Sequence, residues 1–323
     1  MRCIVFTGAG GNEVVDLQER PDPEPGPEDV IVRQPFAGLN PADLQQRAGR
    51  YPAPPGYPAD IPGLEVCGTV EQCGERVQAW QPGDRVFGLV GGGGLADRVL
   101  VHERAVAGVP DTLDDESAAA VAEAFIIAHD AVAVQAALRP GEHLLVHGAA
   151  GAVGSAAVQI GVQMGARVMG VVRHERGRDL MRSLGATPID DEDFAAAVAQ
   201  HTAGHGADVV LELVGAPHFP GNLEALAVRG RMVIVGVAAG QEVQLPLLRM
   251  MQKRATLKGT VLRARPIEEK GAAVRAFERE VVPGLAAGTI RPLVDRVFDA
   301  ADAPAAFDHL AAPGKTGKVL LRF

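Results

Sequence analysis

The stretch LLVHGAAGAVGSAAVQIG at residues 144–161 joins an apolar segment, a run of small residues and a second apolar segment. Within it, Ala149, Gly151 and Gly154 occupy the three positions of a G-x-G-x-x-G pattern, with alanine in the first. Small residues allow the tight turn and the close backbone approach that a pyrophosphate needs at a helix N-terminus. Because strand, turn and helix follow in the order that the motif requires, we predict a dinucleotide site here rather than a turn without a ligand.

The end of the next predicted strand, residues 167–172, is followed by basic side chains. NAD sites usually place Asp or Glu there to hold the ribose 2′-hydroxyl, whereas a positive group suits the 2′-phosphate of NADP. The basic residues are Arg173, His174, Arg176 and Arg178. We therefore predict NADPH in preference to NADH, although the nearby acids Glu175, Asp190 and Asp191 are contrary signs. The alternative is the solvated, charged start of a helix.

The candidate proton donor is a tyrosine in a proline-rich loop. The chain has two tyrosines, Tyr51 and Tyr57, and both lie in this loop, while Asn40 precedes a short predicted helix. A phenol beside a nicotinamide can protonate a substrate after hydride has arrived. One tyrosine is no motif, so both interpretations of Tyr51, proton donor or packing on the loop, remain open. Asp43 fits a helix-surface or hydrogen-bonding residue better than a catalytic base.

The elements that position these residues change in kind near residue 113. The first 120 residues or so predict short strands, one short helix, an exposed loop over 52–62 and a glycine run at 91–94. That run indicates either a flexible loop tip or a close approach of backbone to a ligand. Beyond residue 113, apolar strands alternate with helices, which is typical of a doubly wound parallel sheet.

The last 60 residues predict one amphipathic helix over 266–287, a strand over 290–298, a further helix and the terminal strand 318–323. A terminal strand must pair with a sheet, and we expect it to return to the first domain. The nucleotide-binding domain is then an insertion between two pieces of the other domain.

Composition excludes several classes of protein. Of the 323 residues, 47% are hydrophobic and 22% charged, and 31 Lys and Arg against 40 Asp and Glu give a net charge of −9. This acidity disfavours a general nucleic-acid or anionic-membrane binder. No apolar run is long enough for a membrane span, and no secretory signal is visible, so we expect a cytoplasmic protein. The three cysteines have neither a zinc spacing nor a disulfide framework.

Taken together, these stretches resemble the medium-chain dehydrogenase/reductase superfamily, and within it the zinc-free quinone oxidoreductases, including the tumour-suppressor-inducible type. The resemblance covers nearly the whole chain. It is carried by 38-GLNPADLQQRAGRYPAPPG-56, 61-IPGLEVCGTV-70, 82-PGDRVFGL-89, 93-GGLADRVLV-101, 122-AEAFIIAHDA-131, 147-HGAAGAVGSAAVQI-160, 184-LGA-186 and 259-GTVLRARPIEEK-270.

The resemblance implies an α/β protein with a GroES-like β-barrel catalytic domain, residues 1–122 and 263–323, and a Rossmann NADP(H)-binding domain, residues 123–262. It also implies an active site in the cleft between the domains and a homodimer. Zinc members carry cysteine at the place of Asn40 and histidine at the place of Leu64, so the resemblance implies no metal.

The same resemblance implies roles for individual residues. Asn40 lies near the nicotinamide ribose, and Tyr51 lines the substrate pocket and can donate a proton. The implied cofactor contacts are Gly151, Ala152, Val153, Gly215, Gly236 and Val237. Ile127 departs from a threonine that is common in relatives. Arg263 and Arg265 either flank the cleft or are surface charges.

We therefore expect an NADPH-dependent, zinc-independent oxidoreductase that transfers hydride to a quinone or a related conjugated carbonyl. Two alternatives stay open. One is a 2-alkenal or enoyl-thioester double-bond reductase, which needs a positioned proton donor such as Tyr51. The other is an NADPH-binding protein with little turnover, for which the sequence support is the hydroxyl lost at Ile127.

Overall fold

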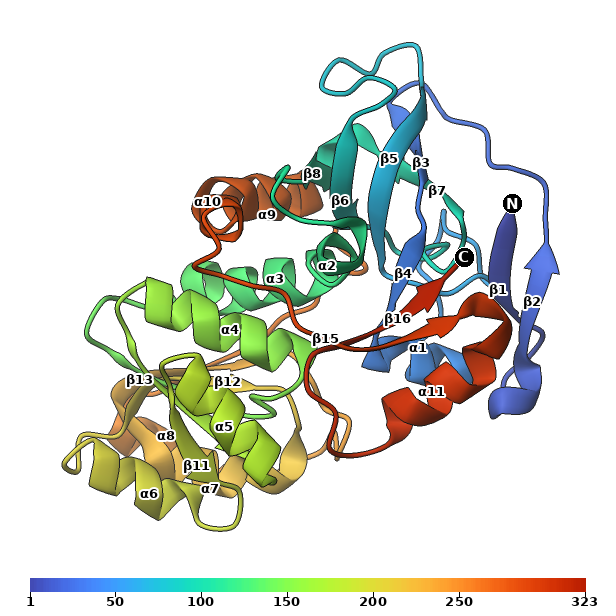
Figure 1. The fold of residues 1–323 in the computed structure, drawn as a ribbon. Coiled ribbons are helices and arrows are strands. Elements are labelled where there is room, and N and C mark those ends of the chain that lie inside the picture. The colour runs from blue at the N-terminus through green and yellow to red at the C-terminus, as the bar shows by residue number, and fades with distance from the viewer. The chain divides into compact units, whose positions relative to one another are not determined.

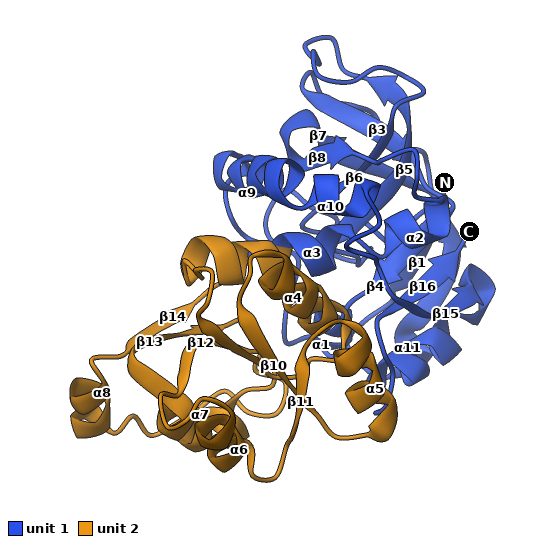
Figure 2. Ribbon diagram, turned by 60° about the vertical axis from the view of Figure 1, so that its left-hand side comes forward, with its two compact units in different colours: residues 1–126, 262–323 blue, residues 127–261 orange.

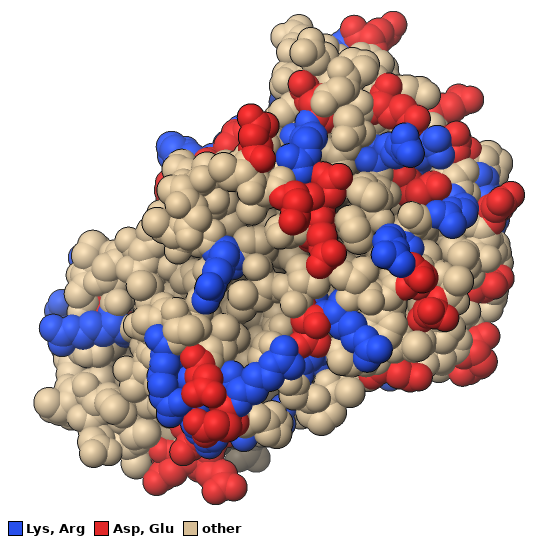
Figure 3. Space-filling view, in the orientation of Figure 1, with Lys and Arg blue, Asp and Glu red and all other residues tan.

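The computed structural model describes all 323 residues, which form two compact units. Unit 1 comprises residues 1–126 and 262–323, and unit 2 comprises residues 127–261 (Figure 2). None of the helices in the protein is long and apolar enough to cross a membrane. On the face shown in Figure 3, basic and acidic side chains are interspersed.

Unit 1 is built on a five-stranded antiparallel sheet of order β7-β3-β5-β6-β8 (Figure 1). Its strands are β3 (Asp29–Arg33), β5 (Glu65–Cys73), β6 (Arg85–Leu89), β7 (Arg98–His102) and β8 (Val106–Gly108). Buried valines such as Val32, Val66 and Val86 fill its interior. β-Branched side chains of this kind pack well on a pleated surface, which explains why these segments are strands.

Two smaller sheets complete the strands of unit 1. One pairs β1 (Arg2–Phe6) with β2 (Val15–Glu19), and the other has the order β15-β16-β4. The strands of the latter are β4 (Phe36–Leu39), β15 (Val294–Asp299) and β16 (Lys318–Arg322). The C-terminal strand β16 pairs antiparallel with β4, which confirms the expected return of the terminal strand to the first part of the chain.

The helices of unit 1 are α1 (Pro41–Arg47), α2 (Asp115–Ala119), α9 (Ile267–Glu280), α10 (Val282–Ala286) and α11 (Ala303–Ala311), while α3 (Ala122–His129) runs into unit 2. The prediction of a single helix over 266–287 is wrong, because the helix is interrupted between α9 and α10. Pro283 lies in the first turn of α10, where its missing N–H is harmless, but within one continuous helix it would remove a hydrogen bond.

Unit 2 is a six-stranded, wholly parallel sheet of order β11-β10-β9-β12-β13-β14. Its strands are β9 (His143–Val146), β10 (Arg167–Val172), β11 (Thr187–Asp190), β12 (Ala207–Glu212), β13 (Leu226–Ile234) and β14 (Thr256–Gly259). In chain order this is 3-2-1-4-5-6, the arrangement of a Rossmann domain. The predicted doubly wound sheet is confirmed.

Helices cover both faces of this sheet, with α4 and α5 on one side and α6 and α7 on the other (Figures 1 and 2). The helices of unit 2 are α4 (Ala152–Gln163), α5 (Glu175–Ser183), α6 (Phe194–His201), α7 (Phe219–Ala225) and α8 (Leu247–Lys253), and α3 continues as a π-helical segment, Asp130–Gln135. The sequence analysis misses β11 and β14, which are short strands at the edges of the sheet. β9 is equally short but wholly apolar after its first residue, whereas β11 contains Pro188 and Asp190.

Candidate functional site

The glycine-rich turn in unit 2 follows the carboxyl end of the central strand β9. Gly148 has a left-handed φ of 58°, and Gly151 is the N-cap of α4. A Cβ at Gly154 would lie 2.3 Å from the Gly148 carbonyl oxygen, so only glycine lets the helix pack this close. The turn therefore has the form that a pyrophosphate site needs, with Ala152 and Val153 in the first turn of the helix.

Alanine at the first fingerprint position is accommodated by the neighbouring strand. Ala149 is fully buried, and its Cβ faces Gly170 on β10. A Cβ at Gly170 would lie only 2.9 Å from the Cβ of Ala149. The extra methyl group of Ala149 thus occupies space that Gly170 leaves free.

The loops after β12 and β13 bring together the three residues implied near the nicotinamide end. A Cβ on Gly215 would lie 2.9 Å from the Cα of Val237, and one on Gly236 would lie 2.4 Å from the Leu213 carbonyl oxygen. Gly215 also has a φ of 116°, which favours glycine. Gly215, Gly236 and Val237 are therefore neighbours at the carboxyl edge of the sheet, and Val237 is exposed there.

Glu212, which the sequence analysis missed, holds the first of these loops. Its carboxylate accepts the backbone N–H groups of Val214 at 2.6 Å and Gly215 at 2.9 Å. Although burial alone would raise it, the pKa of Glu212 lies below its ordinary value because His218 and these amides stabilise the carboxylate. An apolar strand that ends in a glutamate, followed by Leu-Val-Gly, is the signal that was present in the sequence.

Beside Glu212 lies a buried imidazole. His147 is fully buried, and burial lowers its pKa to about 4, so its ring is neutral at physiological pH. Its Nε2 lies 2.6 Å from the Asn222 side-chain oxygen, and Asn222 in turn donates to Glu212. These contacts connect the residue that precedes the glycine-rich turn to α7 and to the end of β12.

The basic residues after β10 differ in exposure and in the pairing of Arg178. Arg178 donates to Asp190 at 2.9 Å and to Glu175 at 3.1 Å, so its charge is already paired. Arg173 and His174 are exposed, and Arg176 is exposed as well. Of the acids that were contrary signs in the sequence, Glu175 and Asp190 are thus partners of Arg178, whereas Asp191 lies 2.9 Å from His218.

Unit 1 contains a buried cluster of charged side chains at the start of α1. Lys318, Glu65 and Asn40 are each at least 95% buried. The Lys318 ammonium is ion-paired with Glu65 and donates to the Asn40 side-chain oxygen at 2.6 Å, while the Asn40 amide donates to Glu65 at 2.9 Å. Asn40 therefore has both ends of its side chain engaged inside unit 1.

A second buried carboxyl group, that of Asp43, lies at the start of α1. Asp43 accepts the backbone N–H of Asn40 at 2.8 Å and that of Gly63 at 3.1 Å. Burial raises the pKa of Asp43 to about 6. Asp43 thus holds the start of α1 and is a hydrogen-bonding residue, as predicted, although it is buried and not on the helix surface.

Tyr51 lies against Arg263. The guanidinium carbon is 4.8 Å from the centre of the tyrosine ring, and Arg263 also donates to the carbonyl oxygens of Gly91 at 2.8 Å and Tyr51 at 3.0 Å. Arg263 is 7% exposed, so the surface-charge interpretation is wrong for this residue. Burial raises the pKa of Tyr51, with Arg263 opposing the shift, so its hydroxyl is a weak acid.

Glu123, at the start of α3, is a titratable group that the sequence analysis did not single out. Its backbone N–H donates to Glu65 at 3.0 Å. Burial and the neighbouring carboxylate of Glu65 raise the pKa of Glu123 to about 7. Its charge also raises the pKa of Tyr51, so the two side chains act on each other. Near neutral pH, Glu123 can therefore both hold and release a proton. Tyr51 holds its proton far more firmly, because its pKa is raised above the ordinary value of a tyrosine.

Other sequence predictions concern the same region. The glycine run 91–94 is a place of close approach, but the approach is to the protein's own chain, because a Cβ on Gly91 would lie 2.5 Å from the Tyr57 ring. Tyr57 accepts a hydrogen bond from the buried Lys270 at 3.1 Å. Ile127 is buried on α3.

The chain matches two protein-family models. Residues 26–111 match the alcohol dehydrogenase GroES-like domain and residues 152–279 the zinc-binding dehydrogenase domain. A quinone oxidoreductase of Lama guanicoe is 32% identical over 327 residues, covering 99% of this chain and 97% of that protein. The chain belongs to the quinone oxidoreductase family. This family lies within the medium-chain dehydrogenases/reductases, so the expected family and fold class are confirmed.

Two solved structures extend the comparison. A mycobacterial protein in complex with NADPH has a TM-score of 0.90 and 29% identity, with all of both chains covered. An NAD-dependent alcohol dehydrogenase has a TM-score of 0.89 and 29% identity, also with all of both chains covered. This member of the quinone oxidoreductase family is thus an oxidoreductase that shares its fold with nicotinamide-dependent enzymes.

Proposed function

We propose that this family member is an NADPH-dependent, zinc-independent quinone oxidoreductase. The observation that carries the proposal is the turn Gly148–Gly154 at the carboxyl end of β9, which places Gly151 at the N-cap of α4, where backbone N–H groups can meet a pyrophosphate. The division into a catalytic domain of residues 1–122 and 263–323 and a nucleotide-binding domain of residues 123–262 is part of this proposal. So is a cytoplasmic location, which suits three free thiols.

The residues of unit 2 fit a nicotinamide dinucleotide. Gly151, Ala152 and Val153 would hold the pyrophosphate, Gly215, Gly236 and Val237 would hold the nicotinamide end, and bound NADPH would supply the hydride. Arg173 and His174, both exposed and without an acid in the usual position, would face the 2′-phosphate. The mycobacterial relative solved with NADPH supports this choice of cofactor.

The side chains of unit 1 do not fit a catalytic zinc ion. An amide, Asn40, and an apolar side chain, Leu64, stand where zinc-dependent members have cysteine and histidine. The ammonium of Lys318 lies between Asn40 and Glu65, so a cation of the protein itself already neutralises the carboxylate. This arrangement supports a reaction without zinc.

Reduction of a quinone to a hydroquinone requires one proton as well as a hydride. With a pKa of about 7, Glu123 is protonated in about half of the molecules at neutral pH. Arg263 provides a positive charge beside Tyr51 that favours negative charge on a reduced oxygen. We therefore assign the proton-holding role to Glu123 and a pocket-lining role to Tyr51. An enone needs protonation at carbon, which depends on a positioned donor more than quinone reduction does.

Turnover with two acceptors tests this function. We expect wild type to oxidise NADPH faster than NADH, and to reduce 9,10-phenanthrenequinone faster than a simple enone. Tyr51→Phe should change the quinone rate less than about threefold, whereas Glu123→Gln should lower kcat at least about tenfold, within the range of general-acid effects. The kcat of wild type should fall as pH rises through about 7, where Glu123 loses its proton, and the profile of Glu123→Gln should be flat.

Tyr57→Phe, outside the proposed chemistry, is the matched control for the Tyr51 and Glu123 variants. Glu65→Asp is unsuitable as a control because it would disturb the ion pair with Lys318. A preference for the enone together with a loss on the order of 10²-fold in Tyr51→Phe would assign the chain to the double-bond reductases. Absence of NADPH oxidation with every acceptor, despite NADPH binding, would support a binding protein.

We further propose a homodimer formed through unit 2. The edge strand β14 pairs on one side only, and the neighbouring helix α8 exposes Leu247, Leu248 and Met251 by 66%, 67% and 71%. Val243, Leu245 and Val261 add exposed apolar surface in the adjoining segments. Exposed apolar side chains gathered in this way mark protein interaction surfaces.

Substitution in this surface should therefore dissociate the dimer. We expect Leu248→Glu combined with Met251→Glu to elute as a monomer in size-exclusion chromatography with light scattering, because two charges cannot be buried unpaired. Val162→Glu, at an exposed position of α4, is the control and should remain dimeric. A dimeric double variant would place the interface elsewhere.

A further inference from the structure

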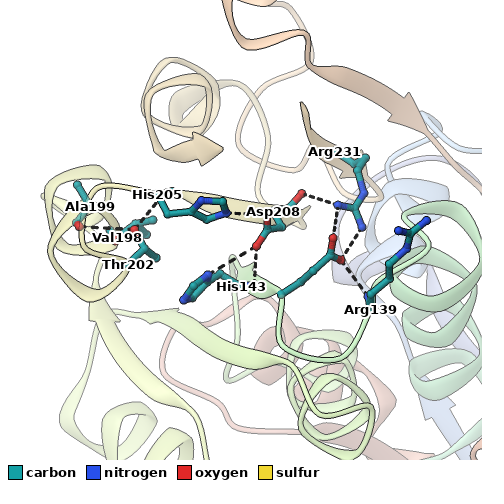
Figure 4. A network of polar contacts seen from close by, with 10 residues as sticks. Arg139, His143, Val198, Ala199, Thr202, His205, Asp208 and Arg231 are labelled. Atoms are coloured by element: carbon teal, nitrogen blue, oxygen red, sulfur yellow. Dashed lines mark hydrogen bonds and ion pairs between the residues drawn. The ribbon is translucent and has the colours of Figure 1, made fainter. Parts of the chain in front are cut away.

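A group of two histidines and one aspartate lies at the opposite edge of the unit 2 sheet from the glycine-rich turn. His143 begins β9, Asp208 lies near the start of β12, and His205 belongs to the loop between α6 and β12 (Figure 4). Both imidazole rings point toward the Asp208 carboxylate. One donor atom from each residue lies within 4.8 Å of the others.

The donor atoms are held by the surrounding backbone. The Nε2 of His205 lies 2.9 Å from one oxygen of Asp208, and the Nδ1 of His143 lies 3.6 Å from the other. The backbone N–H of His143 donates to Asp208 at 2.8 Å, so the carboxylate has a fixed orientation. The loop that carries His205 is fixed as well, because the Thr202 hydroxyl accepts from the Gly206 N–H at 2.8 Å and donates to Val198 at 2.7 Å.

The spacing of the two rings suits a shared metal ion. Two imidazoles bound to one tetrahedral zinc ion at about 2.0–2.1 Å have ring centres about 5–6 Å apart. The centres of His143 and His205 are 5.7 Å apart. The other histidine pair near a carboxylate, His147 and His218 beside Glu212, has centres only 4.3 Å apart, too close for two ligands of one ion without rearrangement.

The second carboxylate near this group is already paired. The nearby Glu142 does not compete, since Arg231 pairs with it at 2.7 Å and the Arg139 amide donates to it at 2.9 Å (Figure 4).

We propose that His143, His205 and Asp208 form a zinc site, with Nδ1, Nε2 and a carboxylate oxygen as ligands and water in the fourth position. Two nitrogens and one carboxylate oxygen are the ligand types that zinc binds. The ion would join β9, β12 and the loop before β12. It would reach the site from solvent on the side of His205, whose side chain is 54% exposed. The site is separate from the reaction proposed above and would stabilise unit 2.

Calorimetric titration of the full chain with zinc chloride, after dialysis against a chelator, tests the proposal. We expect a zinc ion to bind here, and His205→Ala to weaken its binding at least about tenfold, since loss of even an outer partner weakens metal sites about 10–100-fold. His201→Ala, an exposed histidine at the end of α6, is the matched control and should bind as wild type does. Zinc should raise the melting temperature of wild type and His201→Ala but not that of His205→Ala.

Binding that is unchanged in His205→Ala would overturn the proposal, as would no detectable binding at millimolar zinc. Because His205 is exposed and its variant should fold, a far-ultraviolet circular dichroism spectrum like that of wild type keeps this result interpretable. Loss of binding in His218→Ala with retention in His205→Ala would move the site to the carboxyl edge of the sheet and would equally contradict the proposal. None of these readouts depends on quinone reduction.

Discussion

Lys318→Met should destabilise unit 1 by about 3–5 kcal/mol, the range for removing one partner of a buried ion pair. Lys318 and Glu65 are at most 2% exposed, so the variant leaves the Glu65 carboxylate buried without its counter-charge. The Asn40 side-chain oxygen loses its donor at the same time. Unfolding can be followed through the fluorescence of Trp80, the one tryptophan of the chain, which lies in unit 1 and donates to the Glu103 carbonyl oxygen.

Two further variants separate charge from packing. Adding Glu65→Gln to Lys318→Met removes the unpaired charge but keeps a hydrogen-bond acceptor, and should recover at least half of the loss. Arg322→Met, four residues along the same strand, breaks an exposed ion pair with Asp299 and should change stability by about 0–1 kcal/mol. If Lys318→Met were no more destabilising than Arg322→Met, the buried pair would not hold unit 1 together.

Gly154→Ala should abolish most cofactor binding, and should also lower the stability of unit 2. The new Cβ would lie 2.3 Å from the Gly148 carbonyl oxygen and 2.7 Å from the Ala149 Cα, both backbone atoms that cannot move without shifting the turn. Overpacking of this kind costs about 1–3 kcal/mol, occasionally more. We expect NADPH affinity, measured by fluorescence titration, to fall at least about tenfold, together with a lower thermal unfolding temperature.

Gly151→Ala separates an effect on stability from an effect on contact with the cofactor's phosphates. Its Cβ would lie 3.4 Å from the Gly148 oxygen, which the turn can accept, so stability should change little. NADPH affinity should still fall, because the methyl group would occupy the space through which the backbone approaches the pyrophosphate. Gly259→Ala, whose Cβ meets nothing within 4 Å, is the control for both measurements. Unchanged NADPH affinity in Gly151→Ala would contradict the proposed phosphate site.

Several features of the site could be predicted from residues close together in the sequence. The dinucleotide turn is one, because its strand, its glycines and its helix lie within residues 144–161. The parallel sheet is another, since alternation of apolar strands with helices is a local pattern. The four-residue strands β11 and β14 were missed because a short edge strand carries too little pattern to be distinguished from a loop.

The charged cluster of unit 1 was beyond reach of such patterns. Lys318 contacts Asn40 across 278 positions of sequence, through pairing of β16 with β4, and Arg263 contacts Tyr51 across 212. The role of Glu123 depends on this packing too, because an acid at a helix start is ordinarily a solvated residue. Burial beside Glu65 raises its pKa to about 7.

The sequence by itself determined the family, the Rossmann sheet and the position of the glycine-rich turn, because local spacing and hydrophobic periodicity specify them. Only the tertiary structure decided which charges are paired. It paired Arg178 with Asp190, buried Arg263 and assembled His143, His205 and Asp208 at one edge of a sheet. The physical reason is that pairing and burial depend on distances between residues far apart in the chain, and the folding of the whole chain sets those distances.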